Sequence, residues 1–91
     1  MRQVTREIVD AFYNRVTRTI GNSSTDGKTL FLHGNAIAEW REDGLYITNA
    51  RWFSVTTKER LNGLEGVSIF QKNGAWFLNG NPWDGSWIKI S

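Results

Sequence analysis

The chain has 91 residues, of which 40% are hydrophobic and 22% charged, and its formal net charge is +2 at pH 7. This length fits a single domain, which we place at residues 1–91, and it leaves no room for separate catalytic and regulatory domains. The absence of cysteine and the single histidine exclude a disulfide framework and a thiolate metal site, so we expect no bound metal and no cofactor. No apolar run approaches the roughly 20 residues of a membrane span, and we expect a cytoplasmic protein without membrane contact.

An amphipathic pattern predicts a helix over residues 4–14. Apolar side chains recur there at the spacing of one helix face, which directs a stripe toward a core: Val4, Ile8, Ala11 and Phe12. Thr5 is a candidate N-cap, because a threonine hydroxyl accepts a hydrogen bond from an N–H of the first turn. A helix of about ten residues is marginal alone and needs a surface on which to pack.

A polar stretch follows this helix and contains one weak strand signal. Residues 16–20 alternate weakly between apolar and polar side chains and predict an edge strand. Residues 21–27 are rich in Ser, Thr and Gly and end in the turn sequence Asp26-Gly27, so they predict a loop.

Three strand signals come next, at residues 29–33, 36–41 and 45–49. Gly34-Asn35 is a two-residue connection of the hairpin type between the first two strands, and Glu42-Asp43-Gly44 separates the last two. Connections this short join neighbouring antiparallel strands and set their register, so the three runs predict a meander.

A short helix is predicted near residues 56–62. Thr56 and Glu59 have the spacing of a capping box, in which each side chain satisfies the backbone N–H of the other residue. Asn62-Gly63 supplies the C-terminal stop.

The strongest local signal is Asn73-Gly74, which lies between apolar runs at residues 67–72 and 75–79. Asn-Gly favours a type I′ hairpin turn, because both central positions of that turn need a positive φ. Trp76 and Phe77 are adjacent in the second of these strands, so one of them points away from the core. The alternation leaves open which one it is.

Together these elements predict an α+β fold. An N-terminal helix packs on an antiparallel sheet of five to six short strands, the last of them at residues 87–90, and the short helix near residues 56–62 is inserted between strands.

Three sequence elements resemble a group of small proteins of tailed bacteriophages. They are Leu-x-x-His-Gly-Asn-x-Ile-Ala from Leu30, Thr-Thr-x-x-Arg-Leu-Asn from Thr56, and Asn-Gly-x-x-Trp-Asp-Gly from Asn79. The resemblance covers most of the chain after about residue 21. It implies a phage-encoded protein that acts in the host cytoplasm, and it carries over no catalytic residue.

An enzymatic interpretation depends on His33. A histidine in a turn can act as a general base, or it can bond a backbone group and hold the hairpin. Acidic residues flank turns elsewhere, where they commonly serve turn geometry: Asp26, Glu39, Glu42, Asp43 and Asp84. We therefore expect no catalytic residue, and a small hydrolase is the third of three hypotheses.

Residues 51–60 combine aromatic rings, hydroxyls and three cations. Helix N-termini bind anions through free N–H groups, and aromatic and arginine side chains are enriched anchors of protein interfaces. The candidate binding residues are accordingly six from this segment and two from an earlier basic pair: Arg51, Trp52, Thr56, Thr57, Lys58, Arg60, Arg15 and Arg18.

The balance of charge and aromatic content orders the functional hypotheses. Five Trp and five Phe accompany a surplus of only two positive charges, so we expect a non-enzymatic phage accessory protein that binds and modulates or inhibits a host bacterial protein. The alternative is a small DNA- or RNA-binding protein in which the candidate cations contact phosphates and aromatic rings stack on bases. A homodimer is a further alternative, since a second copy can cover an aromatic outer sheet face.

Overall fold

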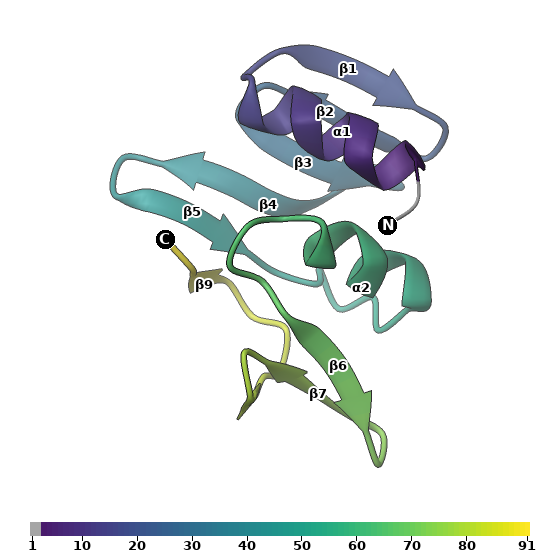
Figure 1. The fold of residues 1–91 in the computed structure, drawn as a ribbon, viewed down its shortest axis with the longest axis vertical. Coiled ribbons are helices and arrows are strands. Elements are labelled where there is room, and N and C mark those ends of the chain that lie inside the picture. The colour runs from purple at the N-terminus through teal and green to yellow at the C-terminus, as the bar shows by residue number, and fades with distance from the viewer. Residues whose placement is uncertain (1–2) are drawn as a thin grey trace.

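The computed structural model describes residues 3–91, which form two helices and nine short strands in two antiparallel sheets (Figure 1). In chain order the elements are α1 (Gln3–Tyr13), β1 (Thr17–Ile20), β2 (Ser23–Asp26), β3 (Thr29–Leu32), β4 (Asn35–Arg41), β5 (Gly44–Ile47), α2 (Val55–Asn62), β6 (Ile69–Lys72), β7 (Ala75–Leu78), β8 (Asn81–Pro82) and β9 (Ile88–Lys89). The α+β class expected from the sequence is confirmed.

The strands divide into two sheets rather than one. The larger sheet has the order β1-β2-β3-β4-β5-β9, and the smaller one has the order β6-β7-β8. Helix α1 packs across β1, β2 and β3, and α2 contacts both β4 and β6, so it lies between the two sheets (Figure 1). The C-terminal strand β9 then returns to the larger sheet and pairs with β5.

The core lies between α1, α2 and the inner faces of both sheets. Its largest fully buried apolar side chains come from both helices and from β3, β4 and β5: Phe12, Ile8, Leu30, Ile37, Leu45, Ile47 and Leu61. The predicted apolar stripe of α1 supplies Ile8 and Phe12 to this core. None of the helices among residues 3–91 combines the length and apolar character needed to cross a membrane.

Thr5 is not the N-cap of α1, as the sequence suggested. It lies inside the helix and is fully buried, where its hydroxyl donates to Glu59 Oε1 over 2.6 Å. A buried hydroxyl needs a partner, and here a residue of α2 supplies it.

The predicted loop at residues 21–27 is wrong, because residues 23–26 form β2. Ser23 and Thr25 point inward and are buried, which a polar composition does not reveal. The turn after β2 is held by Asp26, whose Oδ1 accepts hydrogen bonds from the N–H groups of Lys28 and Thr29 over 2.9 and 2.8 Å.

The hairpin between β3 and β4 turns one residue earlier than predicted. His33 and Gly34 form its two-residue connection with φ values of 52° and 79°, and Asn35 already pairs with Leu32. The β3–β4 register then shifts between Leu30 and Phe31, so that Ile37 is bulged and both Ile37 and Ala38 are buried.

The start of α2 also differs from the sequence expectation. Ser54, not Thr56, is the N-cap, and its hydroxyl accepts a hydrogen bond from the Thr57 N–H over 3.1 Å. Glu59 contacts Thr5 and does not complete a capping box. The predicted stop is confirmed, since Gly63 caps the helix with its N–H bonded to the Arg60 carbonyl.

The β6–β7 hairpin confirms the Asn-Gly signal. Asn73 and Gly74 have φ values of 53° and 81°, as a type I′ turn requires. The open question about the adjacent aromatic residues is also answered: Trp76 and Leu78 are buried, whereas Phe77 is on the outer face and stacks on Phe70.

Candidate binding surface

Arg60 does not reach the surface, although the sequence placed it among the exposed cations. Its side chain is only 3% exposed. Its Nε donates to Ser23 Oγ over 2.9 Å, and its Nη1 donates to Thr5 Oγ1 over 2.7 Å. Arg60 therefore joins α2 to β2 and α1 inside the protein.

Contacts within the protein also occupy the N-terminus of α2. Thr57 is fully buried, and its hydroxyl lies 2.9 Å from Ser54 Oγ. Because Ser54 already occupies the Thr57 N–H, the expected phosphate contact at Thr56, Thr57 and Lys58 loses one of its donors.

The remaining candidate cations lie on separate elements and are largely engaged. The guanidinium of Arg15 lies 4.3 Å from the ring centroid of Trp40, and Arg18 on β1 pairs with Glu7 at 3.2 Å. Lys58 on α2 donates to Gln71 Oε1 over 3.2 Å. Burial thus removes Arg60 from the surface, and contacts within the protein engage Arg15, Arg18 and Lys58.

Apolar side chains gather instead on the segment that leads from β5 into α2, whose first residue is Val55. Trp52 is 54% exposed, Phe53 58% and Val55 76%. Clusters of exposed apolar side chains are uncommon on a monomer and mark contact regions. We call residues 52–55 the aromatic segment.

A strained turn presents this segment. The Trp52 N–H bonds to the Asn49 carbonyl over 2.8 Å, which closes a four-residue turn whose central residues, Ala50 and Arg51, have φ values of 53° and 67°. Neither residue is glycine, so the turn carries left-handed strain that surrounding contacts must offset.

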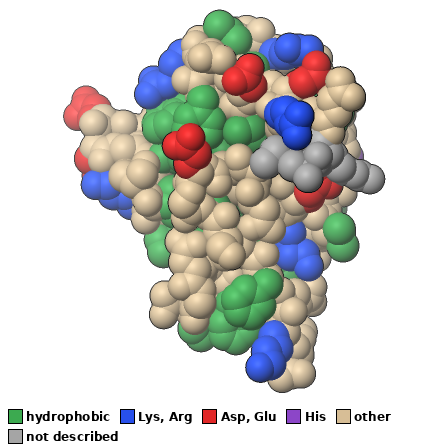
Figure 2. All heavy atoms as spheres, viewed as in Figure 1, with side chains coloured by type: hydrophobic (Ala, Val, Ile, Leu, Met, Phe, Trp, Pro, Cys, Tyr) green, Lys and Arg blue, Asp and Glu red, His purple; other side chains and the backbone are tan. Residues whose placement is uncertain are grey.

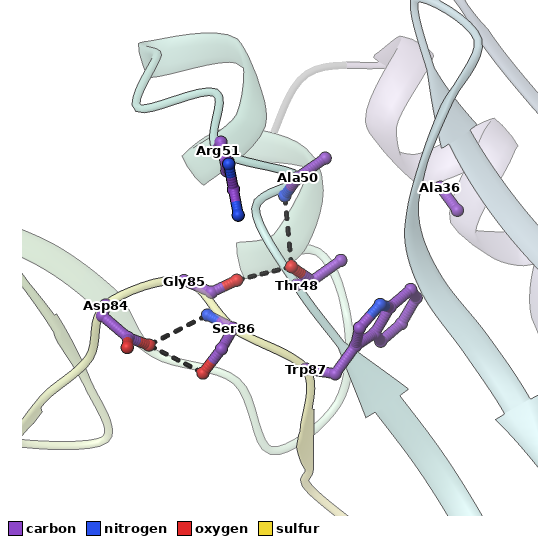
Figure 3. A pocket seen from close by; sticks show the side chains of 8 residues that line it. All are labelled: Ala36, Thr48, Ala50, Arg51, Asp84, Gly85, Ser86 and Trp87. Carbon is purple, nitrogen blue, oxygen red and sulfur yellow. Dashed lines mark hydrogen bonds between the residues drawn. The ribbon is translucent and has the colours of Figure 1, made fainter.

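A second loop supplies those contacts. The buried Asn49 accepts a hydrogen bond from the Arg51 N–H at Oδ1 over 2.8 Å and donates its own N–H to the Gly85 carbonyl over 3.1 Å. Thr48 Oγ1 donates to the same carbonyl and accepts from the Ala50 N–H, as Figure 3 shows. The turn and the loop of residues 84–86 are therefore fastened together.

Asp84 holds that second loop. Its Oδ1 accepts hydrogen bonds from the Ser86 N–H over 3.0 Å and from the Ser86 hydroxyl over 2.7 Å (Figure 3). These bonds hold the pKa of the Asp84 carboxyl below its usual value. The exposed side chain is therefore a carboxylate at neutral pH.

Two hollows flank the joined loops. The first has a volume of about 550 Å³ and contains Arg51 and Trp87 in its wall (Figure 3). The second, about 570 Å³, lies against Phe53, Trp76 and Trp83. Asp84 lines both, so the aromatic segment stands within one continuous, uneven surface.

His33 contacts a neighbouring turn. Its Nε2 lies 3.2 Å from Asn22 Nδ2, so it bonds from the β3–β4 turn to the β1–β2 turn. Within residues 3–91 there is no group of three or more His, Asp and Glu side chains arranged to hold a metal ion.

Sequence reasoning found part of this surface and missed part of it. It selected Arg51 and Trp52, but it left out Phe53 and Asp84, which line the second hollow. The signal for Asp84 was present in the Trp83-Asp84-Gly85 step, which was interpreted as a turn. Only the fold brings that step beside residues 50–53.

The fold and this surface define a small α+β protein whose candidate contact region is an exposed aromatic segment on a braced turn. The chain belongs to the Kyanoviridae Gp96 protein family, whose model matches residues 1–89. The expectation of a phage protein is therefore confirmed at the level of the family, whereas the three motifs stay a prediction. No curated protein and no solved structure matches the chain.

Proposed function

We propose that this phage protein is a non-enzymatic accessory protein that binds a host protein in the host cytoplasm and modulates or inhibits it. The observation that carries the proposal is the exposure of Trp52, Phe53 and Val55 on a turn held by buried hydrogen bonds. A preorganised aromatic segment loses little conformational entropy on binding, which favours its use as an interface anchor.

The distribution of charge supports a protein partner over a nucleic acid. Binding to a phosphate backbone needs several cations on one face. Here Arg60 is buried, Arg18 is paired with Glu7, and Lys58 is bonded to Gln71. The burial of Arg60 and the engagement of Arg18 and Lys58 leave fewer free cations for phosphates, which weakens the nucleic-acid hypothesis.

One feature favours nucleic acid as the second candidate. Phe70, Phe77 and Pro82 pair directly across β6, β7 and β8 on the outer face of the smaller sheet, and the two rings stack with centroids 5.1 Å apart. Figure 2 shows hydrophobic side chains gathered over the β6–β7 end of the molecule beside a basic side chain. Such a platform can stack on unpaired bases.

Affinity capture from host cells tests the proposal. The bait proteins are the wild type, the double variant Trp52→Ala/Val55→Ala, and Phe70→Ala as a matched aromatic control on the other sheet. We expect the wild type and Phe70→Ala to retain one host protein after nuclease treatment and in high salt, and the double variant to lose it.

The same experiment separates the two candidates. Loss of all partners after nuclease treatment, together with loss in Phe70→Ala, would overturn the proposal in favour of nucleic acid, whose affinity falls steeply with salt. Light scattering on each bait shows whether a second copy covers the aromatic segment: a dimer in the wild type that the double variant abolishes would also overturn it.

A further inference from the structure

The second hollow differs in chemistry from the rest of the surface. Its wall includes Phe53 from the aromatic segment, Ala75 and Trp76 from β7, Pro82 from β8, and Trp83 and Asp84 from the chain after β8. We call it the Trp76 groove. Its volume of about 570 Å³ is enough for a large side chain and the adjoining backbone of a bound segment.

Three aromatic rings stand around this groove at mutual angles. The Phe53 and Trp76 centroids are 5.2 Å apart with an interplanar angle of 81°, and those of Trp76 and Trp83 are 6.3 Å apart at 44°. Trp76 and Trp83 are buried beneath the groove, whereas Phe53 is 58% exposed and offers its ring to a guest, and a ring face attracts a cation. Lys58 Nζ already lies 5.8 Å from the Trp76 centroid, so this ring is used for that interaction inside the protein itself.

The groove also carries a negative charge without a counter-ion. Asp84 Oδ1 is occupied by Ser86, and no cationic side chain among residues 3–91 forms an ion pair with Asp84. A carboxylate at the rim of an aromatic groove complements a positively charged guest.

Trp76 contributes an unpaired donor. The residue is only 3% exposed, and its indole Nε1 has no hydrogen-bond acceptor among the described residues. A buried N–H without a partner is costly, so a bound segment that brings an acceptor to it is favoured once the Trp76 ring turns toward the groove. A carbonyl of a bound peptide is an acceptor of this kind.

We propose that the Trp76 groove binds an arginine side chain from an extended segment of the partner protein, with the guanidinium held against the exposed ring of Phe53 and the carboxylate of Asp84. This inference rests on the proposed function, because it takes the partner to be a protein. Arginine fits better than lysine, since its planar guanidinium stacks on aromatic rings and its fork of N–H groups matches a carboxylate.

Peptide selection tests the inference without knowledge of the partner. A random dodecapeptide library is selected in parallel on the wild type, on Asp84→Asn and on Asp43→Asn. Asparagine at position 84 keeps the Oδ1 that Ser86 uses and removes only the charge, and Asp43 is an exposed carboxylate in the β4–β5 turn. We expect arginine enrichment on the wild type and on Asp43→Asn, and its loss on Asp84→Asn.

A titration with one selected peptide and its arginine-to-citrulline analogue locates the contact. Citrulline has nearly the same shape and no charge, so we expect it to bind at least about tenfold more weakly to the wild type and equally to Asp84→Asn. In ¹H–¹⁵N spectra the Trp76 indole resonance shifts on binding, and the same spectra verify that each variant is folded.

Several results would overturn the inference. They are the selection of no peptide, selection without arginine enrichment, equal enrichment on Asp84→Asn, or an unshifted Trp76 indole signal. Its failure is distinguishable from failure of the proposed function. If host-protein capture depends on Trp52 and Val55 but is unchanged in Asp84→Asn, the proposed function stands and the arginine site does not.

Discussion

The guanidinium of Arg60 donates a hydrogen bond to the hydroxyl of Thr5 over 2.7 Å, and both residues are buried. The same guanidinium donates a hydrogen bond to Ser23, and the Thr5 hydroxyl donates one to Glu59. One polar network therefore joins α1, β2 and α2 where an apolar contact would be expected. It explains why a threonine, a serine and an arginine occupy interior positions.

Removing the side chain of Arg60 should destabilise the protein. We expect Arg60→Ala to lower the free energy of unfolding by about 3 kcal/mol, since Ser23 and Thr5 lose the donor that they face in the interior. The control is Arg18→Ala, whose exposed ion pair with Glu7 is worth less than about 1 kcal/mol. Urea unfolding followed by tryptophan fluorescence gives both values, and similar losses in the two variants would contradict the network's role.

Gly85 should tolerate no side chain. A Cβ at this position would overlap the amide of Asn49, and its φ is +89°. We expect Gly85→Ala to cost about 3 kcal/mol, from overlap added to backbone strain. Gly74 has a similar φ of +81° with open space around it, so Gly74→Ala should cost only about 1 kcal/mol. Thermal unfolding of the two variants separates the cost of the overlap with Asn49 from the cost of backbone strain. Equal destabilisation in the two variants would contradict the overlap at position 85.

The strain at Arg51 should be removable. Glycine adopts a φ of 67° without the penalty that a Cβ brings. We expect Arg51→Gly to raise the free energy of unfolding by about 0.5–1 kcal/mol. Thr19→Gly, at an exposed position of β1, should lower it by a similar amount, because glycine weakens a strand. Urea unfolding checks both signs, and destabilisation by Arg51→Gly would show that its side chain stabilises the turn.

Asp26 should make the free energy of unfolding depend on pH in the acidic range. Hydrogen bonds from the backbone N–H groups of Thr29 and Lys28 hold the pKa of its carboxyl below the usual value. A carboxyl with a lowered folded-state pKa stabilises the fold above its unfolded pKa of about 3.9, and this contribution is lost as pH falls through the folded value.

Asp26→Asn keeps the Oδ1 acceptor and cannot titrate. We therefore expect its free energy of unfolding to fall less steeply than that of the wild type below about pH 4. Urea unfolding at several pH values between about 2 and 6 measures the two slopes. Parallel curves would show that the two backbone bonds contribute equally whether or not the carboxyl is charged.

Local signals in the sequence predicted much of the fold. The apolar stripe gave α1, the Asn73-Gly74 step gave the β6–β7 hairpin, and Gly63 gave the end of α2. Each of these depends on residues close together in the chain, where spacing and turn chemistry decide the structure.

The errors at β2 and in the number of sheets share one cause, which is contact between distant residues. The polar side chains of Ser23 and Thr25 indicate a loop at β2. Ser23 is nevertheless buried, and its hydroxyl accepts a hydrogen bond from Arg60. The division into two sheets likewise depends on tertiary pairing. For the site, the sequence pattern indicated Trp52 of the aromatic segment, but only the fold shows that Asp84 and Phe53 line the same hollow.

The pairing of β9 with β5 has a consequence for the order of folding. Tyr46 in β5 pairs with Lys89 in β9, although α2 and the smaller sheet lie between these residues in the sequence. Strands β1 to β5, in contrast, are joined by hairpins between successive strands. Closing so long a loop is entropically slow compared with zipping adjacent strands. Kinetic experiments should therefore find that the amides of the first five strands acquire hydrogen-exchange protection early. The fluorescence of Trp87, which directly precedes β9, should change in a later phase, when β9 pairs with β5 of a sheet that has already formed.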